Sequence, residues 1–127
     1  MKSVAALLKI CQTTFNEYVR LRDKGLPCIS CDAPYFSDFG HLFKVSIRPA
    51  MRFNPGAAHG QCRECNSMHD GNYENFCEGI AARYGVEFLT DIIQEANNSR
   101  KNIHKWSRTE IEDLILFYKN EIKKLKT

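Results

Sequence analysis

Two short motifs, Cys28-Ile29-Ser30-Cys31 and Cys62-Arg63-Glu64-Cys65, decide the fold of this 127-residue chain. Each motif places two cysteines three positions apart, so that one tight turn presents two thiolates to the same metal ion. Two such turns complete a tetrahedral site of four sulfur ligands, whereas a redox Cys-x-x-Cys motif needs no matched second pair. The spacing therefore predicts a structural Zn²⁺ ion whose binding contributes folding free energy.

The remaining cysteines and the composition narrow the class of protein. Cys11 and Cys77 both fall on helical segments, and both are predicted to be core thiols. A hydrophobic content of 43% is ordinary for a globular domain. No run approaches the ~18 consecutive apolar residues of a membrane span, and the first residues do not resemble a secretory signal. We therefore expect a reducing intracellular compartment, where thiols bind metal rather than form disulfides.

The net charge of +3 is unevenly distributed along the chain. Residues 28–99 are net −4, between flanks of +3 in residues 1–27 and +4 in residues 100–127. An anionic partner could bind the flanks, and a divalent cation would suit the acidic middle. The alternative is that the lysines simply solvate exposed helix faces.

Helical hydrophobic spacing predicts an N-terminal helix and several helices after the second motif. The predicted helices cover residues 3–24, 66–84 and 86–96, and a polar, basic linker follows over residues 97–105. A capping box, Ser107 with Glu110, begins the last helix.

A hairpin is predicted between the two cysteine motifs, over residues 41–53. Phe43, Val45 and Ile47 alternate with polar residues, which is the period of a half-buried strand. Pro49 interrupts this pattern and is expected near the turn.

Polar side chains between the two cysteine motifs, and directly after the second motif, form a candidate catalytic cluster. They are His41, Asn54 and His59 before Cys62, and Asn66, His69, Asp70 and Tyr73 after Cys65. On a helix the last four share one face, and a ββα unit would bring the hairpin histidine against them. Imidazole, amide and carboxylate groups together suit phosphodiester hydrolysis, which needs a base for water and a divalent cation.

Each of these residues also has a structural alternative. His41 could be a hydrogen-bonded structural histidine, Asn54 a turn residue, and Asn66 the cap of a helix. His59 could support the zinc site, and His69 could be exposed to solvent.

The order of these motifs resembles the HNH endonucleases of the ββα-metal fold, and more specifically the phage NinG (Rap) family of recombination endonucleases. The resemblance covers most of the chain, and it rests on several stretches. They are Tyr18–Asp23, Pro27–Cys31, Gly40–Phe43, Met51–Asn54, His59–Asn66, Gly71–Tyr73 and Lys105–Ser107.

The resemblance implies roles for individual residues. His41 would be the general base, or a metal ligand if the geometry differs. Asn54 would orient it, with His59 as a competitor for the orienting role. Asn66 and His69 would be candidate ligands of a catalytic Mg²⁺ or Mn²⁺ ion.

Three positions depart from the pattern of the relatives. One is three residues after Asn66, where many relatives carry a basic residue and this chain carries His69. Gly40 stands where many such enzymes carry Asp before the first His, with Asp38 two residues earlier. Ala57 stands five residues before Cys62, where HNH proteins often place their Asn.

The predicted fold class is α+β: a zinc-stapled, HNH-like ββα-metal core with an N-terminal helix and C-terminal helices. We expect a single domain over residues 1–127. Its parts would be the N-terminal helix in residues 1–27, the core in residues 28–84 and a helical extension in residues 85–127.

The predicted function is metal-dependent, structure-specific cleavage of branched or partly single-stranded DNA. Lys44, Arg48 and Arg52 would hold phosphates, and Tyr73 and Trp106 are candidate stacking platforms, with core packing as the alternative for Trp106. The resemblance further implies recombination proteins as partners, a candidate homodimer, and the cytoplasm of a bacterial host of a phage or prophage. The alternative function is a non-catalytic zinc-ribbon module that binds DNA or a recombination protein.

Overall fold

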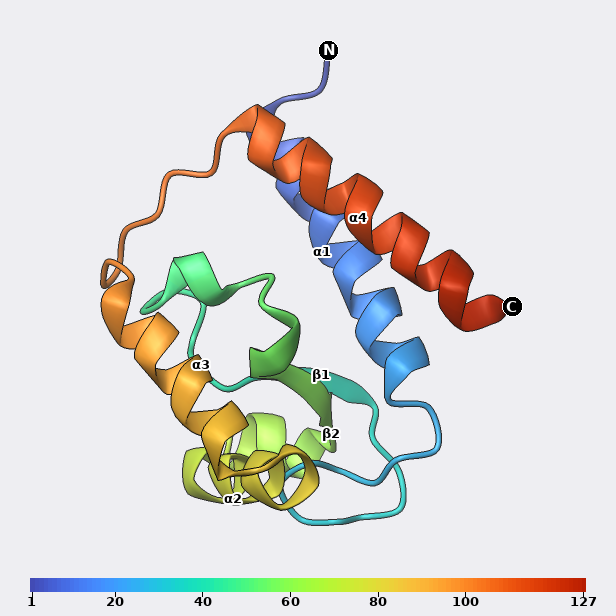
Figure 1. Cartoon of the computed structure of the whole chain (residues 1–127), viewed down its shortest axis with the longest axis vertical. Coiled ribbons are helices and arrows are strands. Elements are labelled where there is room, and N and C mark those ends of the chain that lie inside the picture. The colour runs from blue at the N-terminus through green and yellow to red at the C-terminus, as the bar shows by residue number, and fades with distance from the viewer. The chain divides into compact units, whose positions relative to one another are not determined.

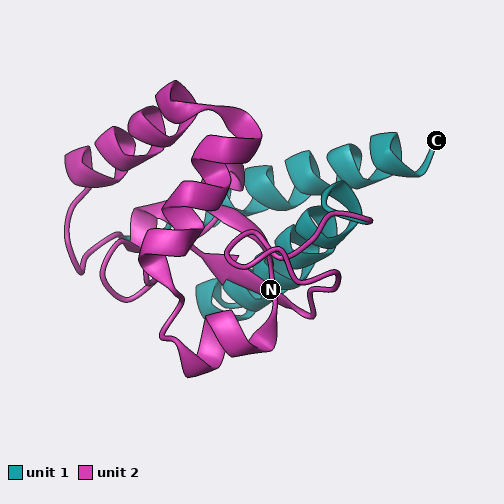
Figure 2. Cartoon of the chain, turned by 90° about the horizontal axis from the view of Figure 1, so that it is seen from below, with its two compact units in different colours: residues 1–24, 105–127 teal, residues 25–104 magenta.

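The computed structural model describes all 127 residues and divides them into two compact units. Unit 1 combines residues 1–24 with residues 105–127, and unit 2 contains residues 25–104 (Figure 2). No helix in either unit is long and apolar enough to cross a membrane.

Unit 1 is a pair of helices, α1 (Val4–Arg22) and α4 (Arg108–Lys126), which pack against each other (Figure 1). The ring of Phe15 on α1 meets Tyr118 on α4 edge to face, with ring centroids 4.9 Å apart. Cys11 is fully buried on the same face of α1, which confirms that it is a core thiol. Both predicted terminal helices are therefore confirmed, as is the capping box at the start of α4.

Unit 2 contains a small sheet and two helices. Strand β1 (Asp38–His41) pairs antiparallel with β2 (Ala58–Gln61), so that His41 lies opposite Ala58 and Asp38 opposite Gln61. Helices α2 (Tyr73–Tyr84) and α3 (Val86–Asn98) follow. Three short helical turns lie at Pro49–Met51, Pro55–Ala57 and Glu64–Met68. The prediction of an α+β fold is confirmed, whereas the single-domain organisation stays a prediction.

The prediction of a hairpin over residues 41–53 is wrong about which residues form the strands. Only His41 belongs to a strand, because the N–H groups of Ile47 and Arg48 both donate to the carbonyl of Lys44 at 2.9 Å. The backbone of this loop therefore closes on itself instead of pairing in a sheet. Pro49 then begins a short helical turn, and the true partner strand lies just before the second cysteine motif.

The helix predicted from Asn66 onward is interrupted before α2. A single wide turn over Glu64–Met68 ends at His69, and Asp70, Gly71 and Asn72 all have positive φ angles, of 48°, 86° and 51°. The four polar residues after Cys65 therefore do not share one continuous helix face. The break lets the chain turn before α2 begins at Tyr73.

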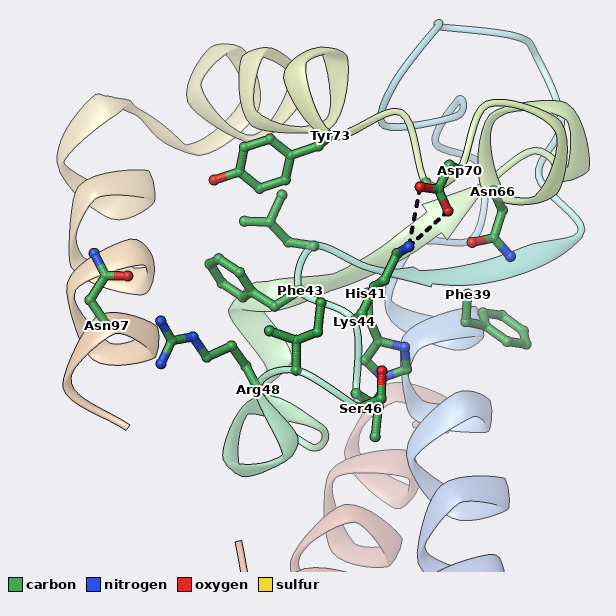
Figure 3. Close-up of a pocket in the computed structure, with 14 residues that line it drawn as sticks. Phe39, His41, Phe43, Lys44, Ser46, Arg48, Asn66, Asp70, Tyr73 and Asn97 are labelled. Carbon is green, nitrogen blue, oxygen red and sulfur yellow. Dashed lines mark hydrogen bonds and ion pairs between the residues drawn. The ribbon is translucent and has the colours of Figure 1, made fainter. Parts of the chain in front are cut away.

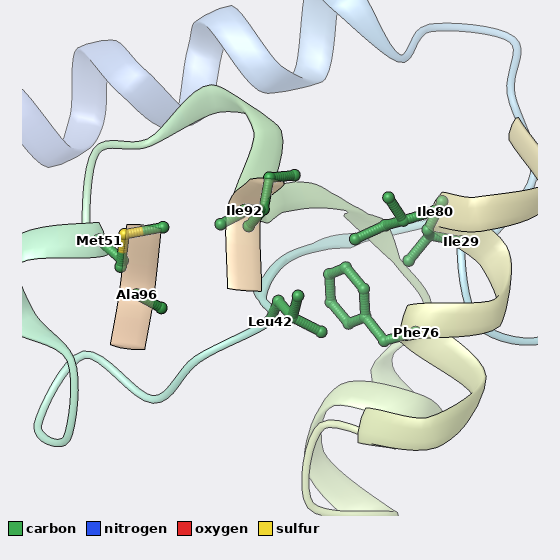
Figure 4. Close-up of a cluster of buried hydrophobic side chains, with 8 residues drawn as sticks. Ile29, Leu42, Met51, Phe76, Ile80, Ile92 and Ala96 are labelled. Carbon is green, nitrogen blue, oxygen red and sulfur yellow. The ribbon is translucent and has the colours of Figure 1, made fainter. Parts of the chain in front are cut away.

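The core of unit 2 joins the sheet to α2 and α3 (Figure 4). Its buried side chains are Ile29, Leu42, Met51, Ala57, Phe76, Ile80, Ile92 and Ala96. Gly79 lets α2 approach the first cysteine motif closely, because a Cβ there would lie only 1.7 Å from the carbonyl oxygen of Ile29. Ala57 is 1% exposed within this apolar core. An Asn at this position, where HNH proteins often place one, would be buried among apolar side chains.

Candidate functional site

The four cysteines of the two motifs converge on one point in unit 2. The sulfur atoms of Cys28, Cys31, Cys62 and Cys65 all lie within 4.8 Å of one another. The Sγ atoms of Cys31 and Cys62 are 3.7 Å apart. Burial, together with the neighbouring thiols, raises the pKa of Cys65 to about 12, so a cation must displace a proton to bind this sulfur. The four cysteines are thus positioned to bind a metal ion, as their spacing predicted.

Hydrogen-bond donors surround the sulfur atoms in a way that fits metal-bound thiolates. The Sγ atom of Cys28 accepts from the backbone N–H groups of Ser30 at 3.4 Å and of Cys62 at 3.3 Å. The Nδ2 atom of Asn72 donates to the Sγ atom of Cys65 at 3.4 Å. Donors of this kind stabilise the negative charge of a thiolate, whereas a neutral thiol has no such charge to stabilise. The donor set is therefore suited to a structural Zn²⁺ ion.

A pocket of about 680 Å³ lies in unit 2, beside the turn that follows the second motif (Figure 3). Its walls come from the end of β1, the loop after it, the turn after Cys65 and the facing ends of α2 and α3. The labelled side chains that line it are Phe39, His41, Phe43, Lys44, Ser46, Arg48, Asn66, Asp70, Tyr73 and Asn97.

His41 is held in one tautomer at the wall of this pocket. Its Nε2 atom lies 3.0 Å from the backbone oxygen of Arg52. Because a carbonyl oxygen only accepts hydrogen bonds, Nε2 carries the proton and the lone pair is on Nδ1. Burial lowers the pKa of His41 below its ordinary 6.5, and the nearby Arg52 charge lowers it further, although the hydrogen bond to the carbonyl acts in the opposite direction. The imidazole is therefore neutral at about pH 7.

Asn66, which also lines the pocket, is paired with a carboxylate from β1. Its Nδ2 atom donates to Oδ2 of Asp38 at 3.0 Å. The other carboxylate oxygen of Asp38 accepts from the hydroxyl of Ser37 at 3.1 Å, and the guanidinium of Arg63 is 3.9 Å away. The side-chain oxygen of Asn66 and the carboxylate of Asp38 are hard oxygen ligands, which Mg²⁺ and Mn²⁺ prefer.

Position 40, between Asp38 and His41, has no room for a side chain. A Cβ atom on Gly40 would lie 2.0 Å from Oε1 of Gln61 and 3.1 Å from the ring of Phe76. An HNH-type Asp is therefore excluded at position 40.

Gln61 is a structural residue that the sequence analysis missed. It is fully buried, and its Nε2 atom donates to the hydroxyl of Ser30 at 2.9 Å and to the carbonyl of Gly71 at 2.8 Å. It thereby ties the first cysteine turn to the turn that carries Asp70. In the sequence, a polar residue directly before Cys62 is only a weak sign of a structural role. Its burial in the fold is what shows that the amide must be hydrogen-bonded.

The cationic side chains predicted to hold DNA separate into two groups. Lys44 lines the pocket and forms an exposed ion pair with Asp70, with 3.0 Å between nitrogen and oxygen. Arg48 lines the pocket as well, and its Nη1 atom donates to the carbonyl of Ser99 at 3.0 Å. Arg52 does not line it, and its guanidinium instead lies 5.1 Å from the ring centre of Phe53.

The whole chain, residues 1–127, matches the protein family described as Bacteriophage Lambda NinG protein. The chain belongs to the NinG family. Protein ninG of Escherichia phage lambda is 32% identical over 121 residues, which cover 94% of this chain and 57% of that protein. The NinG proteins of Escherichia phage 933W and Salmonella phage P22 are 31% and 30% identical, again over 94% of this chain.

The NinG proteins that match are longer than this chain, which spans 57–58% of those from phages lambda, 933W and P22. The names of these relatives state a family and no activity. No solved structure matches the chain.

In this NinG family chain, Asn54 and His59 do not line the pocket. The Oδ1 atom of Asn54 accepts from the N–H group of Gly56 at 2.9 Å, and its Nδ2 atom donates to Glu95 of α3. His59 is 1% exposed, its Nε2 atom is 2.8 Å from the carbonyl oxygen of Gly56, and its ring packs against Phe76. The contacts of Asn54 are those of a turn residue, which was its structural alternative. His59 instead has the contacts of a core histidine, whereas its alternative had been support of the zinc site.

His69 also lies outside the pocket, although its neighbour Asp70 lines it. The His69 ring is exposed, with Nε2 3.4 Å from Oε1 of Glu64. Of the predicted catalytic and catalytic-ion residues, the NinG fold brings His41 and Asn66 to one pocket. The backbone carbonyl of Arg52 contacts Nε2 of His41, and no sequence signal marks a backbone oxygen.

Proposed function

We propose that unit 2 is the catalytic core of a metal-dependent DNA endonuclease that cuts phosphodiester bonds in branched or partly single-stranded DNA. The supporting observation is the tautomer of His41. Its Nε2–H is engaged by the carbonyl of Arg52, and its basic Nδ1 belongs to a neutral imidazole at the wall of a pocket that Asn66 shares. A neutral imidazole in fixed orientation is what general-base catalysis requires.

The reaction that this geometry supports is hydrolysis by water. The Nδ1 atom of His41 takes a proton from a water molecule as the water oxygen forms a bond to phosphorus. The bond between phosphorus and one bridging oxygen breaks, and that oxygen leaves with a proton from solvent. Two strand ends result, one of which carries the phosphate.

Asp38 and Asn66 are the residues that would hold a divalent cation. Their carboxylate and amide oxygens match the preference of Mg²⁺ or Mn²⁺, and the hydrogen bond between them already places the two side chains together. When bound, such an ion neutralises charge on the phosphate and on the leaving oxygen. Asp38 does not itself line the pocket and takes part through its contact with Asn66, which does. We assign no catalytic role to Asn54, His59 or His69, because Asn54 caps a turn, His59 is 1% exposed in the core and His69 is exposed beside Glu64.

A structural Zn²⁺ ion at the four cysteines would fix the position of Asn66. This residue directly follows Cys65, and Asn72, which donates to the Sγ atom of Cys65, closes the turn that also carries Asp70. Zinc here would act through the fold and not in the reaction.

Lys44 and Arg48 would hold the phosphates on either side of the cleaved bond, because both cations line the pocket with His41. Arg52 stays a candidate for a contact with a DNA phosphate outside the pocket. Contacts of this type fix the position of the DNA backbone without reading its sequence.

The proposal is tested with purified protein and a labelled branched DNA in the presence of Mg²⁺ or Mn²⁺. Wild type should cleave, and His41→Ala should not, while both retain one zinc ion per chain. His104→Ala, which changes an exposed histidine outside the pocket, is the matched control and should cleave like wild type. If wild type and His41→Ala bind DNA equally and neither cleaves, the chain is a zinc-containing binding module.

A further inference from the structure

The pocket extends beyond the residues to which the proposed hydrolysis assigns proton transfer or cation binding. Away from His41 and Asn66 it is lined by a second group, Phe43, Arg48, Tyr73 and Asn97, which we call the base end (Figure 3). The rings of Phe43 and Tyr73 are 6.4 Å apart and tilted by 54°. Neither ring has a part in moving the proton or in holding the cation.

The base end is preformed by one backbone hydrogen bond and one side-chain hydrogen bond. The carbonyl of Ile47 accepts from the N–H group of Asn102 at 2.7 Å, and Arg48 donates to the carbonyl of Ser99 at 3.0 Å. These two contacts fasten the loop after β1 to the segment after α3. The wall of the pocket therefore does not have to form when a ligand arrives, which reduces the entropic cost of binding.

The chemistry of the base end matches that of a nucleobase. Tyr73 is 48% exposed and Phe43 is half-buried, so both offer aromatic surface to the pocket. Asn97 brings a side-chain amide with both a donor and an acceptor, and such a group can pair with the edge of a base. Aromatic faces bind unpaired bases of any sequence by stacking.

A base that is paired within a duplex cannot use such a site. Its faces are stacked on neighbouring pairs and its edge is bonded to the partner strand, so entry requires an unpaired or extruded nucleotide. The volume of about 680 Å³ falls in the usual range of pockets that bind small organic groups. Arg48 contributes positive charge beside the rings, which suits the phosphate attached to the base.

We infer that the base end binds one unpaired nucleobase, next to the phosphodiester held between His41 and Lys44. The role of this site in choosing where DNA is cut rests on the proposed function, whereas the binding of the base does not. Cleavage would then favour a nucleotide that is unpaired, at a bulge, a flap or the branch of a junction.

The test uses 2-aminopurine, a fluorescent base, placed in an otherwise identical DNA either as a single-nucleotide bulge or fully paired. Measurements are made without Mg²⁺ or Mn²⁺, so that binding is separated from cleavage. Wild type should change the fluorescence of the bulged base and leave that of the paired base unchanged. Tyr73→Ala should lose about five- to a hundredfold in affinity for the bulged DNA, as expected for one stacked base.

Three further variants control this measurement. Tyr73→Phe keeps the ring and should behave as wild type, which excludes a folding defect at the start of α2. Tyr35→Ala removes a tyrosine that is 81% exposed and outside the pocket, and should also behave as wild type. Asn97→Asp places a negative charge at the base end and should weaken binding of the bulged DNA more than binding of the duplex.

The outcomes separate this site from the proposed function. If Tyr73→Ala gives the same fluorescence change and affinity as wild type, the base end does not bind a base, whether or not Mg²⁺-dependent cleavage occurs. Equal affinity of wild type for bulged and paired DNA would overturn the inference as well. If the bulged base responds as predicted and no cleavage follows on addition of Mg²⁺, the proposed function fails and the base site stands.

Discussion

The Nε2 atom of His41 lies 3.0 Å from the backbone oxygen of Arg52, eleven residues further along the chain. This single contact fixes which ring nitrogen is protonated and therefore which one can act as a base. The resemblance assigned the orienting role to a side-chain amide, whereas this contact comes from a backbone oxygen. Asn54, which the resemblance assigned to this task, caps a short helical turn instead.

The first prediction concerns the pH dependence of cleavage. Burial lowers the pKa of His41 from its ordinary 6.5, so the imidazole is basic throughout the range above that value and becomes protonated only at more acidic pH. The cleavage rate should therefore rise as the pH is raised from acidic values and should reach its plateau before pH 6.5. Single-turnover rates across this range are the measurement, and an acid limb with an apparent pKa well above 6.5 would contradict the assignment of His41.

The second prediction concerns Gly40. The mutation Gly40→Ala places a methyl group 2.0 Å from Oε1 of Gln61, whose amide is held in place by Ser30 and Gly71. We expect a loss of about 1–3 kcal/mol in the free energy of unfolding, as for other overpacked cores. Urea denaturation measures it.

A double-mutant cycle identifies the cause of that loss. Gln61→Ala removes the clashing amide, so Gly40→Ala should cost less in this background than in wild type. Equal costs in the two backgrounds would show that Gln61 does not exclude a side chain at position 40.

The third prediction concerns the metal at the cysteine cluster. Cys31→Ser removes one of four sulfur ligands and should release zinc and abolish the cooperative unfolding of unit 2. Cys77→Ser alters a half-buried thiol outside the cluster and is the matched control, which should retain one zinc ion per chain. Zinc content measured by mass spectrometry decides this, and full zinc occupancy in Cys31→Ser would contradict the assigned ligand set.

The fourth prediction concerns Asp38. Asp38→Asn keeps the shape of the side chain and removes its charge, so it should raise the Mg²⁺ concentration needed for half-maximal cleavage by about tenfold or more. Zinc content should stay unchanged. Asp91→Asn changes an exposed carboxylate on α3 and should have no effect on the Mg²⁺ titration. An unchanged Mg²⁺ requirement in Asp38→Asn would remove Asp38 from the cation site.

The features that the sequence predicted well depend on spacing alone. Four cysteines in two matched pairs must converge to bind one metal ion, and helices with an apolar stripe must pack on that stripe. The position of the hairpin was not predictable in the same way. Its two strands are only four residues long and contain Gly40 and Gly60, whereas the apolar alternation of Phe43 to Ile47 belongs to a loop.

The contacts within the candidate site could be anticipated only in part. His41 and Asn66, which line one pocket, could be singled out because side-chain identity carries the signal. The carbonyl of Arg52 and the buried amide of Gln61 act through tertiary contacts, which a sequence pattern does not encode. The exclusion of a side chain at position 40 follows from packing around Gly40, and only a structure shows that packing.

The most direct test of the central claim is the single-turnover rate at which saturating protein cleaves a labelled branched DNA in Mg²⁺. Loss of a general base reduces such rates by about a hundredfold or more. We predict that His41→Ala falls by at least that factor while its DNA affinity and zinc content match those of wild type, and that His104→Ala cleaves normally. A His41→Ala variant that cleaves at the wild-type rate would show that the pocket at His41 is not where the bond is cut.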